Sequence, residues 1–169
     1  LTERKGKMAE QVKRVKKHMI ALFINTGTKD SPKWIRIKKA TKLEIKLDPQ
    51  KQDYDYISDE SPTTELESYK PGIDGMPLTM YKGEPDFDFV WDKFYGLATG
   101  ADAKVEAMIV FIFDEKAGAN KAWLTEATLS IDSMNAVEGT ITFDLPFGGT
   151  VEKGTAKLLA GVPTFTKGQ

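Results

Sequence analysis

The chain has 169 residues, of which 29% are charged and 40% are hydrophobic, and it contains no cysteine. This length suits one compact domain with its own core and is short for two. No apolar run approaches the roughly 18 residues of a membrane-spanning helix, and a chain without cysteine cannot depend on disulfides or thiolate metal sites. We therefore expect one soluble domain over residues 1–169, with no membrane partner.

The net charge of −1 conceals an asymmetry along the chain. Residues 1–46 carry 14 Lys and Arg against 4 Asp and Glu, whereas residues 47–115 carry 5 against 16. A basic segment can bind nucleic acid, but this asymmetry also suits a subunit whose basic surface meets the acidic surface of a neighbour, and we favour the second interpretation. The basic arm at residues 1–17 supplies four candidate interface residues: Lys13, Arg14, Lys16 and Lys17.

The beginning of the chain gives three expectations. Residues 1–7 consist largely of amino acids with purine-rich codons, as a translated ribosome-binding sequence would, so we hypothesise that Met8 is the natural first residue. Apolar residues at helical spacing make residues 8–17 either a short amphipathic helix or an extended arm. No secretory signal pattern is present, which fits synthesis in a bacterial cytoplasm.

Strand signals and turns alternate in the next segment. Residues 20–25 are an apolar run of β-forming residues, and the turn-rich residues 26–32 follow it. Residues 34–37 resume the strand pattern. Apolar residues alternate with charged ones over residues 43–47, which places the two kinds on opposite faces. This segment therefore predicts three strands.

Residues 48–77 are mostly polar with scattered aromatic residues, so we predict a long loop there. Long structureless loops inside compact domains are uncommon and tend to be functional or disordered. The apolar side chains argue against disorder, since they would lie exposed unless a partner covers them. An acidic loop of this kind is typical of a partner-binding arm, here with five candidate interface residues: Tyr54, Tyr56, Ile57, Tyr69 and Ile73.

A short strand at residues 77–81 leads into the strongest helix signal in the chain. Asp86 is a suitable N-cap, and Gly100 is the expected stop. The apolar face between them has residues at helical spacing: Phe87, Val90, Trp91 and Phe94. We expect one aromatic-rich helix packed on a sheet.

The second half of the chain is almost entirely strand. Residues 105–113 are apolar on both faces, as in a central strand, and the later strands show period-two alternation. A hairpin turn is expected at residues 133–136. The other strands are expected at residues 123–131, 140–147, 151–159 and 162–166. About eight strands and one helix predict a mainly β fold, a sandwich or barrel with one flanking α-helix and a long loop.

No residue pattern predicts a metal site. His18 is the only histidine, and with no cysteine it lacks the usual zinc partners. The pairs Asp53-x-Asp55 and Asp86-x-Asp88 begin like calcium loops but lack the glycine and the glutamate that complete an EF-hand. We expect no metal and interpret these carboxylates as solvated loop and helix-cap groups.

Catalytic and cofactor patterns are equally weak. Gly149 and Gly154 have P-loop spacing, but Thr155 stands where the phosphate-binding lysine is needed. Carboxylates are so abundant that no pair singles out a glycosidase-like site. Basic residues with Trp34 for stacking suit phosphate binding, although strand alternation favours solvated or subunit-contact surfaces for them. We predict that the chain is not an enzyme and has no cofactor.

Several segments together resemble tail tube (major tail) proteins from phages and prophages of Gram-positive bacteria. The resemblance runs from about residue 12 to the end of the chain, in order and spacing. It rests on residues 21–28 (ALFINTGT), 32–37 (PKWIRI), 69–74 (YKPGID), 81–87 (YKGEPDF), 99–103 (TGADA) and 161–165 (GVPTF).

This resemblance implies a structural virion protein. It implies a β-sandwich with one flanking helix that forms homo-hexameric rings, stacked through the long loop at residues 48–77 and the chain termini. The implied partners are further copies of itself, the tail terminator, the tape measure and the baseplate or tail tip proteins. DNA would pass transiently through the lumen, so the lining is expected to be polar or acidic, as alternation at Thr140, Thr142 and Asp144 would provide.

Three alternatives remain open from the sequence. The same fold suits the inner tube of a contractile phage tail or a phage-tail-like bacteriocin. A nucleic-acid-binding β-barrel would use the basic segment, and a carbohydrate-binding sandwich would use exposed aromatic residues. Neither of the last two accounts for an acidic loop combined with a basic N-terminus.

Overall fold

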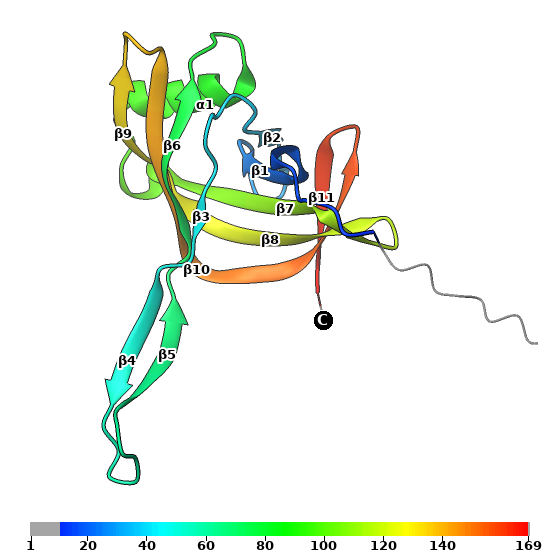
Figure 1. The fold of residues 1–169 in the computed structure, drawn as a ribbon. Helices are drawn as coiled ribbons and strands as arrows, with labels where there is room; N and C mark the ends of the chain where they lie inside the picture. Colours follow the sequence, from blue (N-terminus) through cyan, green and yellow to red (C-terminus); the bar gives the residue numbers. More distant parts are fainter. Residues whose placement is uncertain (1–10, 169) are drawn as a thin grey trace, which may run out of the picture.

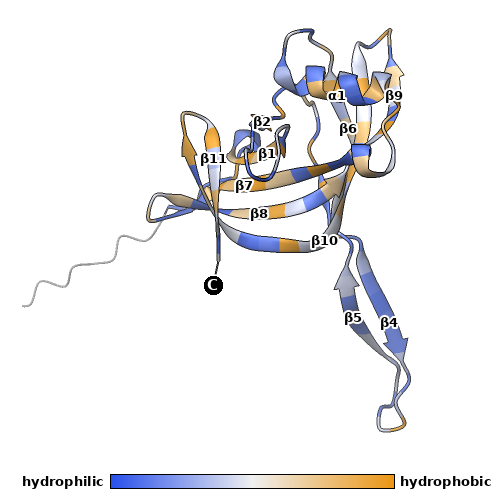
Figure 2. Cartoon of the chain, turned by 180° about the vertical axis from the view of Figure 1, so that it is seen from behind, coloured by the Kyte–Doolittle hydropathy of each residue, from blue (hydrophilic) through white to orange (hydrophobic). Residues whose placement is uncertain are grey.

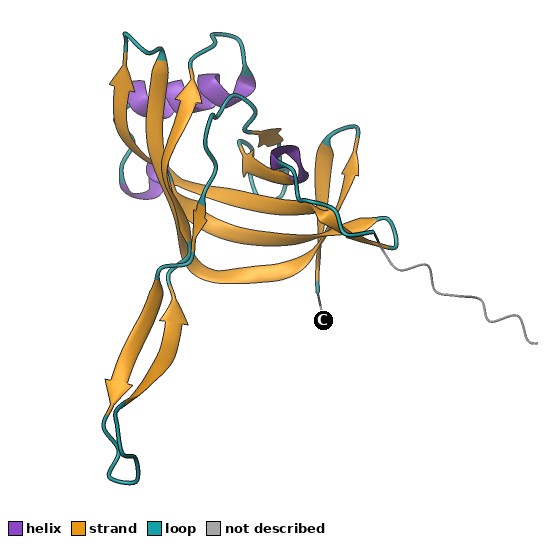
Figure 3. Ribbon diagram, in the orientation of Figure 1, coloured by secondary structure: helices purple, strands orange, loops and turns teal. Residues whose placement is uncertain are grey.

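The computed structural model describes residues 11–168, and this part of the chain is mainly β with one α-helix (Figures 1 and 3). The predicted fold class is confirmed, although the strands outnumber the eight or so expected. The elements in chain order are η1 (Lys17–Met19), β1 (Ile20–Asn25), β2 (Trp34–Arg36), β3 (Ile45–Lys46), β4 (Pro49–Tyr54), β5 (Thr63–Tyr69), β6 (Gly72–Thr79), α1 (Pro85–Tyr95), η2 (Gly100–Ala103), β7 (Lys104–Lys116), β8 (Ala119–Thr128), β9 (Ser130–Asn135), β10 (Thr140–Leu159) and β11 (Val162–Lys167).

The body of the molecule consists of two antiparallel sheets that share β10. The large sheet runs in the order β2-β1-β7-β8-β10-β11, and the small sheet runs β9-β10-β6-β3. Figure 1 shows β10 curving from beside β6 to lie below β8. Within the described residues, β4 and β5 pair only with each other and belong to neither sheet.

β10 is one continuous strand where the sequence predicted two, at residues 140–147 and 151–159. Its first part pairs with β6 and β9, and its second part pairs with β8 and β11. The register against β8 shifts between Gly148 and Glu152, and Gly149 has a φ of 62°, which glycine adopts without steric cost. The glycines therefore bend the strand without ending it.

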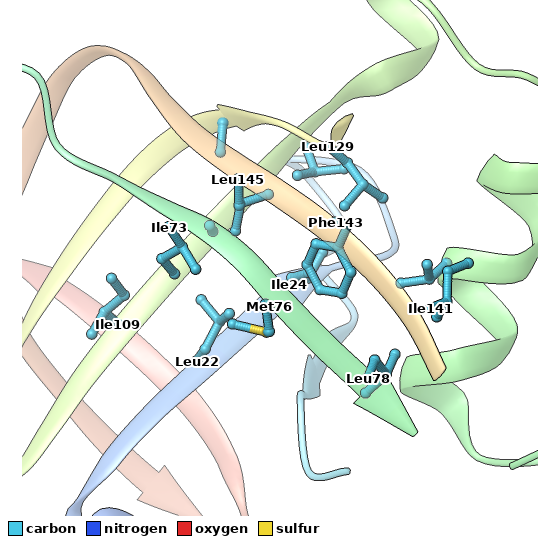
Figure 4. Close-up of a cluster of buried hydrophobic side chains, with 14 residues drawn as sticks. Leu22, Ile24, Ile73, Met76, Leu78, Ile109, Leu129, Ile141, Phe143 and Leu145 are labelled. Atoms are coloured by element: carbon cyan, nitrogen blue, oxygen red, sulfur yellow. The ribbon is translucent and has the colours of Figure 1, made fainter. Parts of the chain in front are cut away.

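The main hydrophobic core lies between the two sheets. Alternate residues of β1 and β7 face the small sheet, and Phe143 of β10 is completely buried among them. Figure 4 shows these side chains converging from β1, β6 and β10. Its labelled members are Leu22, Ile24, Ile73, Met76, Leu78, Ile109, Leu129, Ile141, Phe143 and Leu145.

A second apolar cluster lies on the other face of the large sheet. Its buried members alternate with those of the main core along β1 and β7, which explains why both strands are apolar on both faces. β11 comes close to β2, so the large sheet curls toward a barrel around this cluster. The buried members are Ala21, Phe23, Met108, Val110, Ala122 and Ala156, and the partly buried members packed against them include Trp34, Leu158 and Phe165.

The boundaries of α1 differ from the prediction. The N-cap is Glu84, not Asp86, because Pro85 occupies the first helical position, where its missing N–H costs nothing. The helix ends at Tyr95, well before Gly100. Asp86 lies in the first turn and is buried, at 2% exposure. The predicted apolar face packs on the main core through Phe87, Val90 and Phe94.

Several strand boundaries also differ from the prediction. The strand expected at residues 123–131 stops at Thr128, and the N–H of Leu129, just beyond it, donates to the carbonyl of Ala103 at 2.8 Å. A new strand, β9, then continues to Asn135, through the residues where a turn was expected. β3 is confined to Ile45–Lys46, although the alternating pattern covered residues 43–47.

The N-terminal segment is extended in its described part. Residues 11–16 have no regular secondary structure, and the 3-10 helix η1 follows them. This favours the arm over the amphipathic helix between the two forms expected for residues 8–17. The hypothesis about Met8 and residues 1–7 falls outside the described residues.

The largest correction concerns residues 48–77, where a long loop was predicted. The structure has two strands there, β4 and β5, followed by β6, which begins at Gly72. The sequence pattern failed because β5 is exposed along its whole length and β4 nearly so, so neither strand carries the alternation of a half-buried strand. The segment is a β-hairpin with a short tip at residues 55–62.

Candidate assembly surface: the projecting hairpin and a basic groove

The β4–β5 hairpin projects away from the body (Figure 1). Its strands pair in antiparallel register from Pro49 opposite Tyr69 to Tyr54 opposite Thr63, with an irregularity after Gln50. Figure 2 shows both strands coloured mainly as hydrophilic. An isolated two-stranded hairpin is only marginally stable in water. The hairpin therefore depends on its own side-chain contacts or on a partner.

Two tyrosines stabilise this hairpin by stacking and by hydrogen bonds across its strands. The rings of Tyr54 and Tyr56 stack with centroids 5.5 Å apart and planes 11° from parallel. The hydroxyl of Tyr54 donates to Glu67 Oε1 at 2.5 Å, and that of Tyr56 makes a longer bond to Glu65 Oε1 at 3.4 Å. The bond to Glu67 raises the pKa of Tyr54 above the ordinary 10.0, and desolvation, aided by the charge of Glu65, raises the pKa of Tyr56. Both hydroxyls therefore remain protonated donors at neutral pH.

The hairpin is strongly acidic. Residues 49–69 contain six Asp and Glu and one Lys. Some of these carboxylates hold the tip: Asp53 accepts from the hydroxyl of Thr64 at 2.6 Å, and Asp59 accepts from that of Thr63 at 3.1 Å. Others, including Asp55 and Glu60, are exposed. The tip therefore has exposed carboxylates in addition to those that hold it together.

The tip also exposes apolar surface. Ile57 is fully exposed, at 107%, and Tyr56 is 45% exposed. Tyr69, at the base of the hairpin, is 52% exposed. A fully exposed isoleucine beside a half-exposed tyrosine, on an arm that pairs with no other described strand, suits contact with a partner.

The five residues predicted for the stacking loop are only partly brought together. Tyr54, Tyr56 and Ile57 lie at the outer end of the hairpin, whereas Tyr69 lies at its base. Ile73 is a correction, since it belongs to β6 and is completely buried in the main core. Its side chain is therefore not available to a partner.

The predicted basic arm lies apart from the hairpin. Figure 1 shows the segment leading to η1 and the β4–β5 hairpin leaving the body in different directions. The four candidate residues are all exposed: Lys13, Arg14, Lys16 and Lys17. Contact between the acidic hairpin and the basic arm, as expected from the sequence, therefore requires two copies of the chain.

A basic groove of about 660 Å³ lies on the body beside the base of the hairpin. Its apolar lining includes the buried side chains of Leu22 and Met76 and the half-buried Ile45. Its basic residues outnumber the single acidic one, Glu44, and they are Lys17, Arg36, Lys38 and Lys42. The sequence did not reveal this groove because η1, β1, β6 and the segment between β2 and β3 all contribute to it.

The wall of the groove is held by hydrogen bonds that its backbone N–H groups donate. The carboxylate of Asp86 accepts the backbone N–H groups of Lys38 at 3.1 Å and Lys39 at 3.2 Å, and the N–H of Ile37 donates to the carbonyl of Leu22 at 2.9 Å. Buried hydrogen bonds to a charged acceptor are stronger than neutral ones. The backbone of the wall is therefore fixed, while the side chain of Lys38 stays exposed.

Comparison with known proteins gives little similarity. No family model matches the chain, and no curated protein matches it. Among solved structures, a chain of the "Cryo-EM structure of the anti-feeding prophage (AFP) baseplate, 6-fold symmetrised" is similar at 9% sequence identity and a TM-score of 0.45, covering 85% of this chain and 97% of that chain. A likeness at this level does not establish a function.

The residues considered for metal chemistry have other surroundings. Within residues 11–168, no group of three or more His, Cys, Asp or Glu is arranged to hold a metal ion. His18 is exposed, and its carbonyl accepts a bond from Arg36 at 3.1 Å. Asp88 accepts the N–H of Gly83 at 3.1 Å, next to the start of α1. In the same part of the chain, no helix has the length and apolar character needed to cross a membrane.

Proposed function

We propose that this chain is the structural subunit of a tail tube, in a phage or a phage-derived particle. It polymerises into stacked homo-hexameric rings around a lumen through which DNA passes, and it works without a cofactor or a catalytic site. Its partners are further copies of itself and the proteins that begin and end the tube: the tape measure, the tail terminator and the baseplate or tail tip proteins. Its location is the tail of the particle, after synthesis in the host cytoplasm.

The observation that carries this proposal is the projecting hairpin. It packs on no other described part of the chain, yet it holds a braced pair of tyrosines and a fully exposed Ile57. Such an arm has little use in a monomer, because an unsupported hairpin contributes little to folding. It suits a protein that reaches a neighbouring subunit.

The sheet edges support the same proposal. β2 and β11 end the large sheet, and each has one side without a hydrogen-bonded strand among the described residues. Open edges are a liability for a monomer, whereas head-to-tail pairing with identical neighbours can close a ring and cover them. The resemblance of several sequence segments to tail tube proteins suggests the hexameric, stacked form of that ring.

The lumen needs a face that does not hold phosphate strongly. Thr140, Thr142 and Asp144 alternate with buried residues on β10 and lie half-buried on the outer side of the small sheet. Asp144 also accepts the N–H of Gly75 at 2.6 Å. A surface of hydroxyls and a carboxylate lets DNA slide, because neutralised phosphates are what give salt-dependent affinity.

The test is negative-stain electron microscopy of the concentrated protein, beside the variant Tyr54→Ala with Tyr56→Ala. Hollow rings or tubes are expected for the natural sequence. The variant should keep its circular dichroism spectrum and melting temperature but stop growing into tubes. Light scattering should fall as salt is added, since the contact joins opposite charges.

Two results would contradict the proposal. A double variant that still forms normal tubes would remove the hairpin from assembly. A natural chain that stays monomeric and binds DNA tightly, with strong salt dependence, would favour the nucleic-acid-binding β-barrel. A tube that forms and also binds a sheath protein would indicate the contractile version of the same function.

A further inference from the structure

The hairpin tip and the basic groove have complementary chemistry. The hairpin at residues 49–69 has a net charge of −5, from six acidic residues and one basic. The groove has four Lys or Arg and one Glu, a net charge of +3. The tip carries the fully exposed Ile57, and the groove has an apolar floor whose accessible side chains include Ile20, Leu43 and Ile45.

The tip cannot fill the groove of its own chain. The groove is lined by Glu44 and Ile45, just before β4 begins at Pro49. From Pro49 to Ile57 the chain runs outward for eight residues, which at strand geometry is about 26 Å. Figure 1 shows the hairpin directed away from the body over this length. Only a second copy can bring a tip to this groove.

We infer that the tip of the β4–β5 hairpin of one copy docks into the basic groove of a second copy. This contact rests on the proposed function and names the surface that receives the hairpin. Ile57 and Tyr56 lie against the apolar floor, and the exposed carboxylates of Asp55 and Glu60 face Lys38 and Lys42 on the rim.

The groove suits a receptor because its wall is preformed. Asp86 fixes the backbone at Lys38 and Lys39, so docking does not have to order that segment. The ion pair between Lys42 and Glu44, at 3.4 Å, is half-exposed on both sides, so Lys42 can exchange this partner for a carboxylate of the tip at little cost.

This contact joins two different surfaces of the same molecule. A tip-to-groove contact leaves the first copy with an open groove and the second with an open tip. When it repeats head to tail from copy to copy, such a contact continues in one direction. The contact therefore suits growth along a tube axis, while ring closure uses other surfaces.

The test reverses charges on one surface at a time in the full chain. The groove variant is Lys38→Glu with Lys42→Glu, and the tip variant is Asp55→Lys with Glu60→Lys. Each should raise the protein concentration needed for polymerisation by about 100-fold, because like charges brought together oppose docking. Sedimentation velocity and electron microscopy give the readout.

A matched control changes the same charge elsewhere. Lys29→Glu with Lys33→Glu alters two exposed lysines at the same spacing, outside the groove. This variant should polymerise at nearly the natural concentration. Ile57→Ser provides a second test that leaves the charge unchanged and should weaken assembly by about tenfold through lost apolar burial.

Mixing experiments test the direction of the contact. In an equimolar mixture of groove variant and tip variant, the natural tip of one fits the natural groove of the other and the reversed tip fits the reversed groove, so alternating copies should elongate although neither variant does so alone. A chain with all four substitutions should polymerise again, since both surfaces are reversed together.

The outcomes separate this contact from the proposed function. Natural tubes together with a groove variant that behaves like the Lys29 and Lys33 control would overturn the docking contact and leave the tube function standing. A mixture of the two variants that assembles no better than either variant alone would also overturn it. A natural chain that never assembles, at any concentration, would overturn the tube function and the contact with it.

Discussion

The body and the hairpin of this molecule are held together in different ways. The body has two hydrophobic clusters, one on each face of the large sheet, and Phe23 and Phe143 are almost completely buried in them. The hairpin has no buried residue; its strands are joined by their ladder, a stacked pair of tyrosines and hydroxyl-to-carboxylate bonds. The body has a core of its own, so we expect it to fold without the hairpin, whereas the hairpin has no core to stabilise it.

This difference explains why acidic residues concentrate on the hairpin. A segment without a core can carry like charges at little folding cost, because those charges remain in water. In the proposed tube, the same charges would steer the hairpin toward a basic partner. We therefore expect substitutions in the body to affect stability and substitutions in the hairpin to affect assembly.

The largest effect on the body is expected from Phe143→Ala. Removing a completely buried aromatic ring should lower the free energy of unfolding by about 3–5 kcal/mol, through lost burial and a cavity. Urea denaturation followed by circular dichroism measures this change. Phe113→Ala, at a half-exposed ring, is the control and should cost less than about 1.5 kcal/mol. Equal losses would mean that the main core does not dominate stability.

A smaller loss is expected from Asp86→Ala, which links the body to the groove. The backbone N–H groups of Lys38, Lys39 and Phe87 would lose their acceptor, at a cost of about 2–3 kcal/mol. Polymerisation should weaken as well, because the groove wall is no longer fixed. Thermal melting and light scattering measure the two effects. A variant with reduced stability but normal assembly would show that the wall need not be preformed.

Removing the hairpin tests whether the body is stable without it. Replacing residues 50–68 by two glycines joins Pro49 to Tyr69, which already face each other in the ladder. The free energy of unfolding should change by less than about 1 kcal/mol, since an isolated hairpin is only marginally stable. Tube formation should be abolished. A large loss of stability on urea denaturation would show that the hairpin supports the body.

The smallest effect concerns pH. Because the folded pKa of Tyr54 is raised, its bond to Glu67 contributes below pH 10.0 and is lost as the pH rises through the raised pKa. The hairpin should therefore loosen at high pH before the body unfolds. Glu67→Gln should move the titration of Tyr54 toward lower pH, measured by ultraviolet absorbance of tyrosinate. An identical titration curve would show that this bond is absent in solution.

The sequence predicted those parts of the fold that face a core. β1 and β7 are apolar on both faces because both faces are buried, and the helix was found from Val90 and the aromatic residues at helical spacing around it. β10 was split in two because Gly148 and Gly149 resemble a turn, although they only bend the strand. Local sequence patterns therefore predict which faces are buried, but they do not show whether a strand continues through a bend.

The candidate site was predictable only in composition. The acidic, aromatic character of residues 48–77 indicated a partner-binding arm, but its hairpin form left no period-two signal, since almost no residue of β4 or β5 faces a core. Ile73 looked like part of that arm and is buried in β6. The groove could not be predicted from the sequence, because it forms where segments distant in the chain meet.

The sharing of β10 between the two sheets has a mechanical consequence. Among the described strands, this strand alone pairs in both sheets, so it links them mechanically through its backbone as well as through the core between them. The ladder to β8 is interrupted between Gly148 and Glu152, which makes this short stretch the compliant part of the strand. In the proposed tube, this interrupted stretch is where each subunit would yield first when the tube bends.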